Sequence, residues 1–142
     1  MKKIFLDTNI LLDSIQQREK KDYAEMILQF GKEGKIQNFA SFLSFADIAY
    51  IIRKNSPETI ISALKTLSAI VNVLPMDNAL LQKALTQPSK DFEDMLQYQC
   101  ALTAGCDVIV TNNIKHFQDF CTISLKTSED FLLEWNETDE KK

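Results

Sequence analysis

Ile4-Phe5-Leu6-Asp7-Thr8-Asn9 is the stretch that decides the fold of this chain. Its three apolar residues lead directly into a carboxylate, a hydroxyl and an amide. A short apolar run of this kind predicts a strand that is buried on both faces, as the strands of a parallel sheet are. Asn9 is a good N-cap for the apolar segment after it, so we expect a helix to begin there. Because ligands bind beyond the carboxyl ends of strands in an open α/β sheet, Asp7 is a candidate site residue.

The rest of the chain alternates helical and extended patterns. Apolar residues at helical spacing predict helices over 22–32, 41–54, 57–70, 77–85, 91–104 and 128–135, and short apolar runs predict strands over 36–40, 71–76, 107–111 and 122–125. Strands that alternate with helices are typical of a parallel α/β sheet. We expect a single domain over residues 1–135 and a flexible acidic tail over 136–142.

The charge, the apolar segments and the cysteines of the chain limit the kinds of protein that it can be. The net charge of −4 argues against a protein that binds a long duplex over its whole surface, but not against a nuclease whose clustered carboxylates hold a cation. The sequence has no apolar window of membrane-helix length and no signal peptide, which predicts a cytoplasmic protein without a membrane partner. Three cysteines without metal-ligand spacing indicate buried reduced thiols, with a redox or zinc role as the alternative.

Acidic residues converge in the predicted topology. In a parallel α/β sheet, strand carboxyl ends share one rim with the start of each helix that leads into the next strand. Asp7 ends a strand, Asp47 lies in the first turns of an apolar helix, Asp91 and Asp94 open another helix, and Thr111–Asn113 follow the fourth strand. Helix capping explains any one of these acids, but it accounts less well for Asp7 and Asp47.

Carboxylates in apolar surroundings must be paired, protonated or coordinated. Several of them close together repel one another, and a divalent cation resolves that repulsion. Hard oxygen ligands with room for water favour Mg²⁺ or Mn²⁺ over zinc. The sequence therefore indicates a divalent cation site on this rim.

Four short motifs of this chain, taken in their order along the sequence, resemble those of PIN domains. They are Asp7-Thr8-Asn9 after a strand, Ser44 with Asp47 in an apolar helix, Asp91-Phe92-Glu93-Asp94 at a helix start, and Val110-Thr111-Asn112-Asn113 after a strand. These motifs extend over nearly the whole chain. Among PIN domains, the chain most resembles the small VapC-like toxin ribonucleases. The resemblance implies a three-layer α/β/α, Rossmann-like domain with a parallel sheet of four or five strands in the order 3-2-1-4-5.

The resemblance also implies an activity and its residues. It implies a Mg²⁺- or Mn²⁺-dependent ribonuclease that acts on RNA, is commonly a homodimer, and is held inactive by a small antitoxin. The catalytic metal ligands would be Asp7, Asp47 and Asp94. The residues that would orient substrate or water are Thr8, Asn9, Ser44, Thr111 and Asn113. Two positions depart from the family: Asp47 stands where Glu is common, and Asn113 with His116 stands where a fourth acid is common.

Two other functions remain open on the sequence alone. One is a degenerate PIN domain that acts as a binding module. The other is an aspartyl phosphotransfer domain with Asp7 as the phosphoryl acceptor, although a phosphatase of the haloacid dehalogenase type needs a second Asp where Asn9 stands.

The sequence also predicts the roles of two further residues and one helix near this rim. We expect Asp91 to cap its helix and turn away from the cleft, and His116 to be a surface or loop residue. The helix over 41–54 is so apolar that we expect self-association or partner binding beside it.

Overall fold

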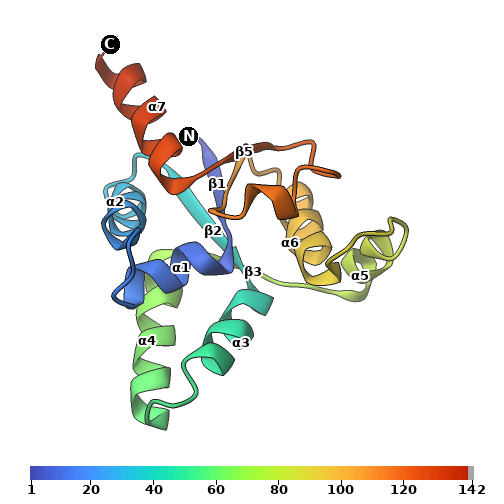
Figure 1. Ribbon diagram of the computed structural model, residues 1–142, viewed down its shortest axis with the longest axis horizontal. Coiled ribbons are helices and arrows are strands. Elements are labelled where there is room, and N and C mark those ends of the chain that lie inside the picture. The colour runs from blue at the N-terminus through green and yellow to red at the C-terminus, as the bar shows by residue number, and fades with distance from the viewer. Residues whose placement is uncertain (141–142) are drawn as a thin grey trace.

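A five-stranded parallel sheet forms the centre of the computed structural model, which describes residues 1–140, with side chains through Glu137 (Figure 1). The strands are β1 (Lys3–Leu6), β2 (Gln37–Ser41), β3 (Asn72–Leu74), β4 (Val108–Val110) and β5 (Ser124–Lys126). Their order is β3-β2-β1-β4-β5, and every neighbouring pair is parallel. The predicted α/β fold and strand order are confirmed.

Helices cover both faces of the sheet. They are α1 (Thr8–Ile15), α2 (Lys21–Lys32), α3 (Phe42–Ile51), α4 (Pro57–Ile70), α5 (Asn78–Ala84), α6 (Phe92–Thr103) and α7 (Ser128–Glu140), with a short 3-10 helix, η1 (Ile114–His116). Alternate residues of β1 point to opposite faces: Ile4 and Leu6 pack with α1, α2, α4 and α7, whereas Phe5 packs with α5 and α6. The domain therefore has the predicted three layers.

Asp7, not Asn9, is the N-cap of α1, so the predicted cap is wrong. The Asp7 backbone is extended, and its side chain accepts a hydrogen bond from the Thr8 backbone N–H. Both residue types are good caps, but the Asp7 backbone N–H also donates to the Val110 carbonyl of β4, which keeps Asp7 in line with the sheet. The helix therefore begins two residues earlier than predicted.

Other element boundaries differ modestly from the predicted ones. Helix α3 ends at Ile51 rather than Lys54. Helix α7 extends to Glu140, into the segment predicted as a flexible tail, whose last two residues lie outside the described part of the chain. The flexibility of that tail stays a prediction. None of the helices within residues 1–140 combines the length and the apolar composition needed to cross a membrane.

The cysteines are free thiols, as predicted. Cys100 and Cys106 are buried, and Cys121 is half-buried. Burial raises the pKa of Cys100 to about 12 and that of Cys106 to about 11. Thiols with such pKa values are poor nucleophiles at neutral pH.

Candidate active site

The predicted convergence of acids occurs in the structure. A cleft of about 300 Å³ opens at the carboxyl edge of the sheet, and its lining includes Asp7, Thr8, Asn9, Asp47, Asp94 and Asn113. The other two predicted site residues, Ser44 and Thr111, are fully buried and hydrogen-bond to lining residues. All of the predicted site residues therefore belong to one assembly, which draws on β1, α1, α3, α6 and the segment after β4.

Asp7 is a buried carboxylate that forms no ion pair within the described residues. Its side chain is 6% exposed; Oδ1 accepts from the Thr8 N–H at 2.8 Å, and Oδ2 accepts from the Thr111 hydroxyl at 2.9 Å. Burial raises the Asp7 pKa above its usual range, while these two hydrogen bonds oppose the rise. No Lys or Arg within the described residues forms an ion pair with it. Its charge must be neutralised by a proton or by a bound cation.

Glu93 is a site residue that sequence reasoning missed. It lines the same cleft as Asp47. The nearness of the Asp47 carboxyl group, followed by burial and by the charges of Asp47, Asp91 and Asp94, raises the Glu93 pKa to about 8. The buried Oδ2 of Asp47 has no hydrogen-bond partner among the described residues.

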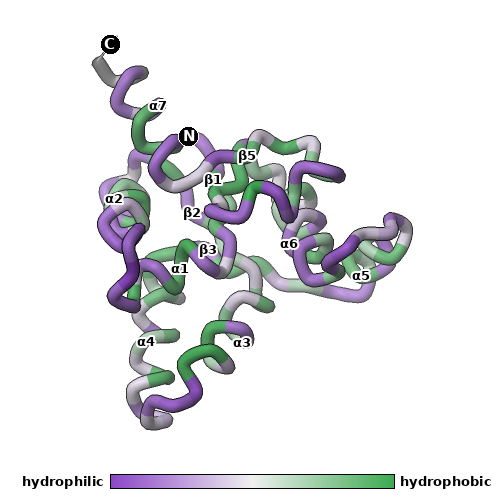
Figure 2. Tube along the Cα trace, viewed as in Figure 1, coloured by the Kyte–Doolittle hydropathy of each residue, from purple (hydrophilic) through white to green (hydrophobic). Residues whose placement is uncertain are grey.

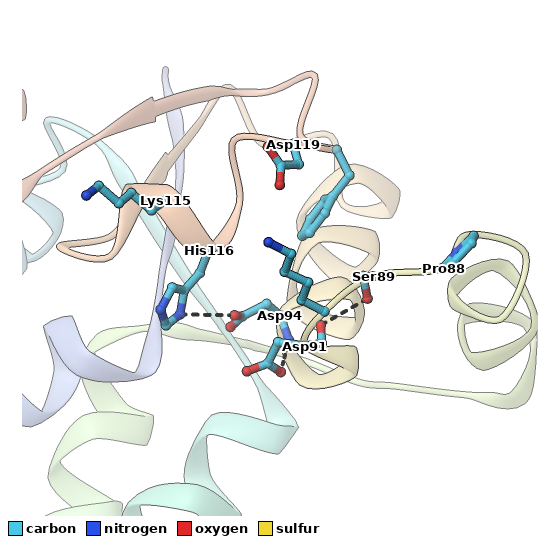
Figure 3. Close-up of a pocket in the computed structure, with 9 residues that line it drawn as sticks. Pro88, Ser89, Asp91, Asp94, Lys115, His116 and Asp119 are labelled. Carbon is cyan, nitrogen blue, oxygen red and sulfur yellow. Dashed lines mark hydrogen bonds and ion pairs between the residues drawn. The ribbon is translucent and has the colours of Figure 1, made fainter.

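Asp94 and His116 are in contact at the other end of the cleft. The Oδ2 atom of Asp94 lies 3.2 Å from Nδ1 of His116 (Figure 3). Burial, followed by the charges of Asp91 and Asp7, raises the Asp94 pKa to about 6, and His116 opposes this rise. His116 is on the surface as predicted, with its side chain 56% exposed, yet it belongs to the site.

Asp91 has two roles, of which only one was predicted. It caps α6, because its Oδ1 accepts from the Asp94 backbone N–H at 3.2 Å. The expectation that it turns away from the cleft is wrong: it lines the cleft, and one ligand atom each from Asp91, Asp94 and His116 lie within 4.8 Å of one another. Capping uses one carboxylate oxygen and leaves the other available.

A buried polar network supports the acids from behind. Thr8 and Ser44 hydroxyls are 2.8 Å apart, and the Nε2 group of Gln97 donates to Ser44 at 3.1 Å and to Thr8 at 3.4 Å. Gln97 is 1% exposed, and sequence reasoning missed it. Its position three residues after Asp94, on the same helix face, is the signal that could have found it. The network ties α1, α3 and α6 together beneath the cleft.

The donor set fits a hard divalent cation. The cleft offers carboxylate oxygens from Asp7, Asp47 and Asp94 and the amides of Asn9 and Asn113. One buried Asp47 oxygen has no hydrogen-bond partner in the described part of the chain. Oxygen ligands of this kind suit Mg²⁺ or Mn²⁺. A cation here would satisfy the unpaired oxygen and the buried Asp7 charge together.

Removing divalent cations should make stability sensitive to pH through these acids. The folded-state pKa values of Asp7, Glu93 and Asp94 are raised, so the stability they contribute is present at low pH and is lost as pH rises through the folded values. For Glu93 the window runs from about 4.5 to about 8. In EDTA, the melting temperature of the wild type should fall relative to Glu93→Gln across this window, as checked by calorimetry. If the melting temperatures of the two proteins change with pH in the same way, the raised pKa is not that of Glu93.

Comparison with known proteins agrees with this architecture. A family model described as PIN domain matches residues 3–115. Ribonuclease VapC1 of Aquifex aeolicus (strain VF5) is 26% identical over 140 residues, which is 94% of this chain and 96% of the relative.

Three solved structures have a similar fold. VapBC2 from Rickettsia felis, bound to a promoter DNA fragment, matches with a TM-score of 0.68 and 20% identity over 88% of this chain and 98% of that chain. VapBC-1 from nontypeable Haemophilus influenzae matches with a TM-score of 0.67 and 23% identity over 89% and 98%. Mycobacterium tuberculosis VapC20, a toxin that cleaves the sarcin–ricin loop, matches with a TM-score of 0.59 and 15% identity over 75% and 86%.

Proposed function

Because this chain belongs to the PIN domain family, we propose that it is a divalent-metal-dependent endoribonuclease and the toxin of a toxin–antitoxin pair in the cytoplasm. The observation that carries the proposal is the cluster of carboxylates around the buried, uncompensated Asp7 at one rim of the sheet. The similarity to Ribonuclease VapC1 over nearly the full length of both chains supports RNA as the substrate.

We infer that Asp7, Asp47 and Asp94 hold the cation, Mg²⁺ or Mn²⁺. When bound, the cation would lower the pKa of a coordinated water and neutralise charge on the scissile phosphate. Thr111 fixes Asp7 through its hydroxyl, and Thr8 with Ser44 fixes the start of α1 against α3. Asn9 and Asn113 line the cleft, where their amide groups would orient a water molecule or a phosphate oxygen.

The surroundings of Asp7 argue against the phosphotransfer alternative. An aspartyl phosphatase of the haloacid dehalogenase type needs a second Asp two residues on, and Asn9 lines the cleft at that position. The Asp7 side chain is also only 6% exposed, which restricts access of a phosphoryl donor. We therefore favour Asp7 as a cation ligand.

The direct test is metal-dependent RNA cleavage. Purified protein incubated with cellular RNA should cut it in Mg²⁺ or Mn²⁺ and not in EDTA. Asp7→Asn should lower the cleavage rate by at least about a thousandfold, because several kcal/mol of charge stabilisation is lost at about 1.4 kcal/mol per tenfold. Circular dichroism would verify that the variant is folded. Equal cleavage in EDTA would contradict metal dependence, and metal-bound protein that binds RNA without cutting it would instead identify a binding module.

Helix α3 presents an apolar surface that supports the proposed partners. Phe42 and Tyr50 are each 66% exposed and Ile51 is 44% exposed, on the largely hydrophobic helix that Figure 2 shows at the periphery of the molecule. Tyr50 and Ile51 also line the acidic cleft. A homodimer partner or an antitoxin seated on α3 would therefore lie at the mouth of the cleft.

Assembly can be tested by a charge on this surface. We expect the wild type to be a dimer by light scattering, or to be recovered with a small partner protein. Phe42→Lys should weaken self-association at least tenfold, because an exposed aromatic anchor is typically worth about 2 kcal/mol. Leu85→Lys is the matched control, since Leu85 is 58% exposed at the end of α5. A monodisperse wild-type monomer without a partner would contradict the prediction.

A further inference from the structure

A second cavity adjoins the acidic cleft. Its volume is about 560 Å³, and it shares Asp91, Asp94 and His116 with the cleft (Figure 3). Small-molecule pockets of this size accept a nucleotide. Any RNA whose phosphate lies at the acids would place a neighbouring nucleoside in or near this cavity.

Lys90 supplies the cationic side of the cavity. It directly precedes Asp91, lines the cavity, and forms no ion pair with a carboxylate in the described residues. Lys115 also lines the cavity, but its amine extends away from Asp91 and Asp94 in Figure 3. Lys90 is therefore the better-placed contact for an RNA phosphate beside the acids.

Phe120 supplies an apolar wall. It is half-buried, and its ring packs against Tyr98 at a centroid distance of 5.4 Å and against Phe117 at 6.1 Å. These contacts hold the ring in place while part of it lines the cavity. Rigid aromatic rings are the usual stacking platforms for unpaired RNA bases.

Asp119 supplies the selective group. Its carboxylate points into the cavity in Figure 3 and has no hydrogen bond or ion pair among the described residues. A carboxylate offers two adjacent acceptors and no donor. Of the four RNA bases, only guanine presents two adjacent donors, N1–H and N2–H, on its Watson–Crick edge. Adenine and cytosine pair one donor with an acceptor, and the single N–H of uracil lies between two acceptors.

We propose that this cavity binds a guanine nucleoside next to the scissile phosphate, with Asp119 accepting from the base, Phe120 stacking on it and Lys90 contacting a phosphate. The proposal rests on the proposed ribonuclease function for its position beside the cut. It adds a base preference that the acidic cleft alone does not supply.

Mononucleotide binding tests the cavity without any cleavage. Titrating GMP, AMP, CMP and UMP into the wild type should give at least about tenfold tighter binding of GMP, because one bidentate contact discriminates by about 1–3 kcal/mol. Asp119→Asn should abolish this preference, since an amide offers one donor and one acceptor. Asp22→Asn, an exposed acid on α2, is the matched control and should retain it. Equal binding of the four nucleotides to the wild type would overturn the proposal.

Cleavage of a random RNA pool tests the position of the guanine. Sequenced ends from the wild type should be enriched in guanine at one fixed position beside the cut, and Asp119→Asn should lose this enrichment. Lys90→Ala should slow cleavage without changing the enrichment, whereas Lys65→Ala on α4 should change neither. Cleavage without guanine enrichment would overturn the proposal and leave the ribonuclease function standing. Selective GMP binding without any cleavage would overturn the ribonuclease function and, with it, the place of the bound guanine beside a cut, while the guanine site itself would stand.

Discussion

Asp94→Asn is expected to leave the protein folded and to lower metal-dependent RNA cleavage by at least about a thousandfold. Asp94 lies in the first turn of α6, and its side chain is only 14% exposed among other acids. The amide has nearly the same shape but no charge for a cation. Its introduction also removes a carboxylate whose pKa is raised to about 6 by burial and then by repulsion from Asp91 and Asp7. Single-turnover cleavage and thermal unfolding in EDTA measure the two effects, and we expect unfolding no lower than that of the wild type.

Asp91→Ser is the matched comparison. Serine caps a helix about as well as aspartate, so α6 should keep its start. Asp91 lines the cleft beside Asp94 and His116, so some loss of activity is expected, within about tenfold if its carboxylate acts through a water rather than as a ligand. An inactive Asp91→Ser beside an active Asp94→Asn would show that the two roles are reversed.

Thr111→Val should reduce both stability and cleavage. Valine has the shape of threonine but lacks the hydroxyl that donates to Asp7 Oδ2 at 2.9 Å and accepts from the Asn113 N–H at 3.0 Å. Hydrogen bonds to charged groups contribute about 1.5–3 kcal/mol, so we expect a loss of about 2 kcal/mol in the free energy of unfolding at neutral pH. The Asp7 pKa should rise further, because the Thr111 hydrogen bond now opposes the effect of burial. Cleavage should fall by about 10–100-fold, as for other groups that orient metal ligands.

Thr111→Ser separates the hydroxyl from the methyl group. Serine keeps both hydrogen bonds and removes one buried methyl, so its stability should fall by only about 1 kcal/mol. Urea unfolding and a Mn²⁺ titration of cleavage compare the three proteins. If valine and serine behave alike at position 111, the hydroxyl does not position Asp7.

The alternation of strands and helices predicted the parallel sheet and the convergence of acids on one rim, whereas the strand order was predicted only through the resemblance to PIN domains. The N-cap of α1 was wrong for a different reason. Asp7 and Asn9 are equally good caps by residue type. The choice between them depends on the contacts that Asp7 makes with Val110 and Thr111, more than a hundred positions along the chain.

Glu93 could not be found from the sequence for a related reason, and Gln97 was indicated only by its spacing of three residues from Asp94. Glu93 resembles an ordinary exposed acid in the first turn of a helix, and only the approach of α3 to α6 brings Asp47 against it. Gln97 resembles a polar residue on a solvated face until Thr8 and Ser44 pack over it. In both cases the deciding contact joins two elements that are far apart in the sequence.

The separation of Asp7 and Thr111 by 104 residues has a consequence for the protein during its synthesis. At about 5–20 residues per second, roughly 5–20 s pass on the ribosome between these two residues. Until β4 and Thr111 have been translated and have left the exit tunnel, β1 lacks its β4 neighbour, and Asp7 lacks the hydroxyl that positions it. We therefore expect a nascent chain to cleave RNA poorly even after its acids have been made. A chain truncated before β4 should likewise lose activity, although the acids of the site precede that strand.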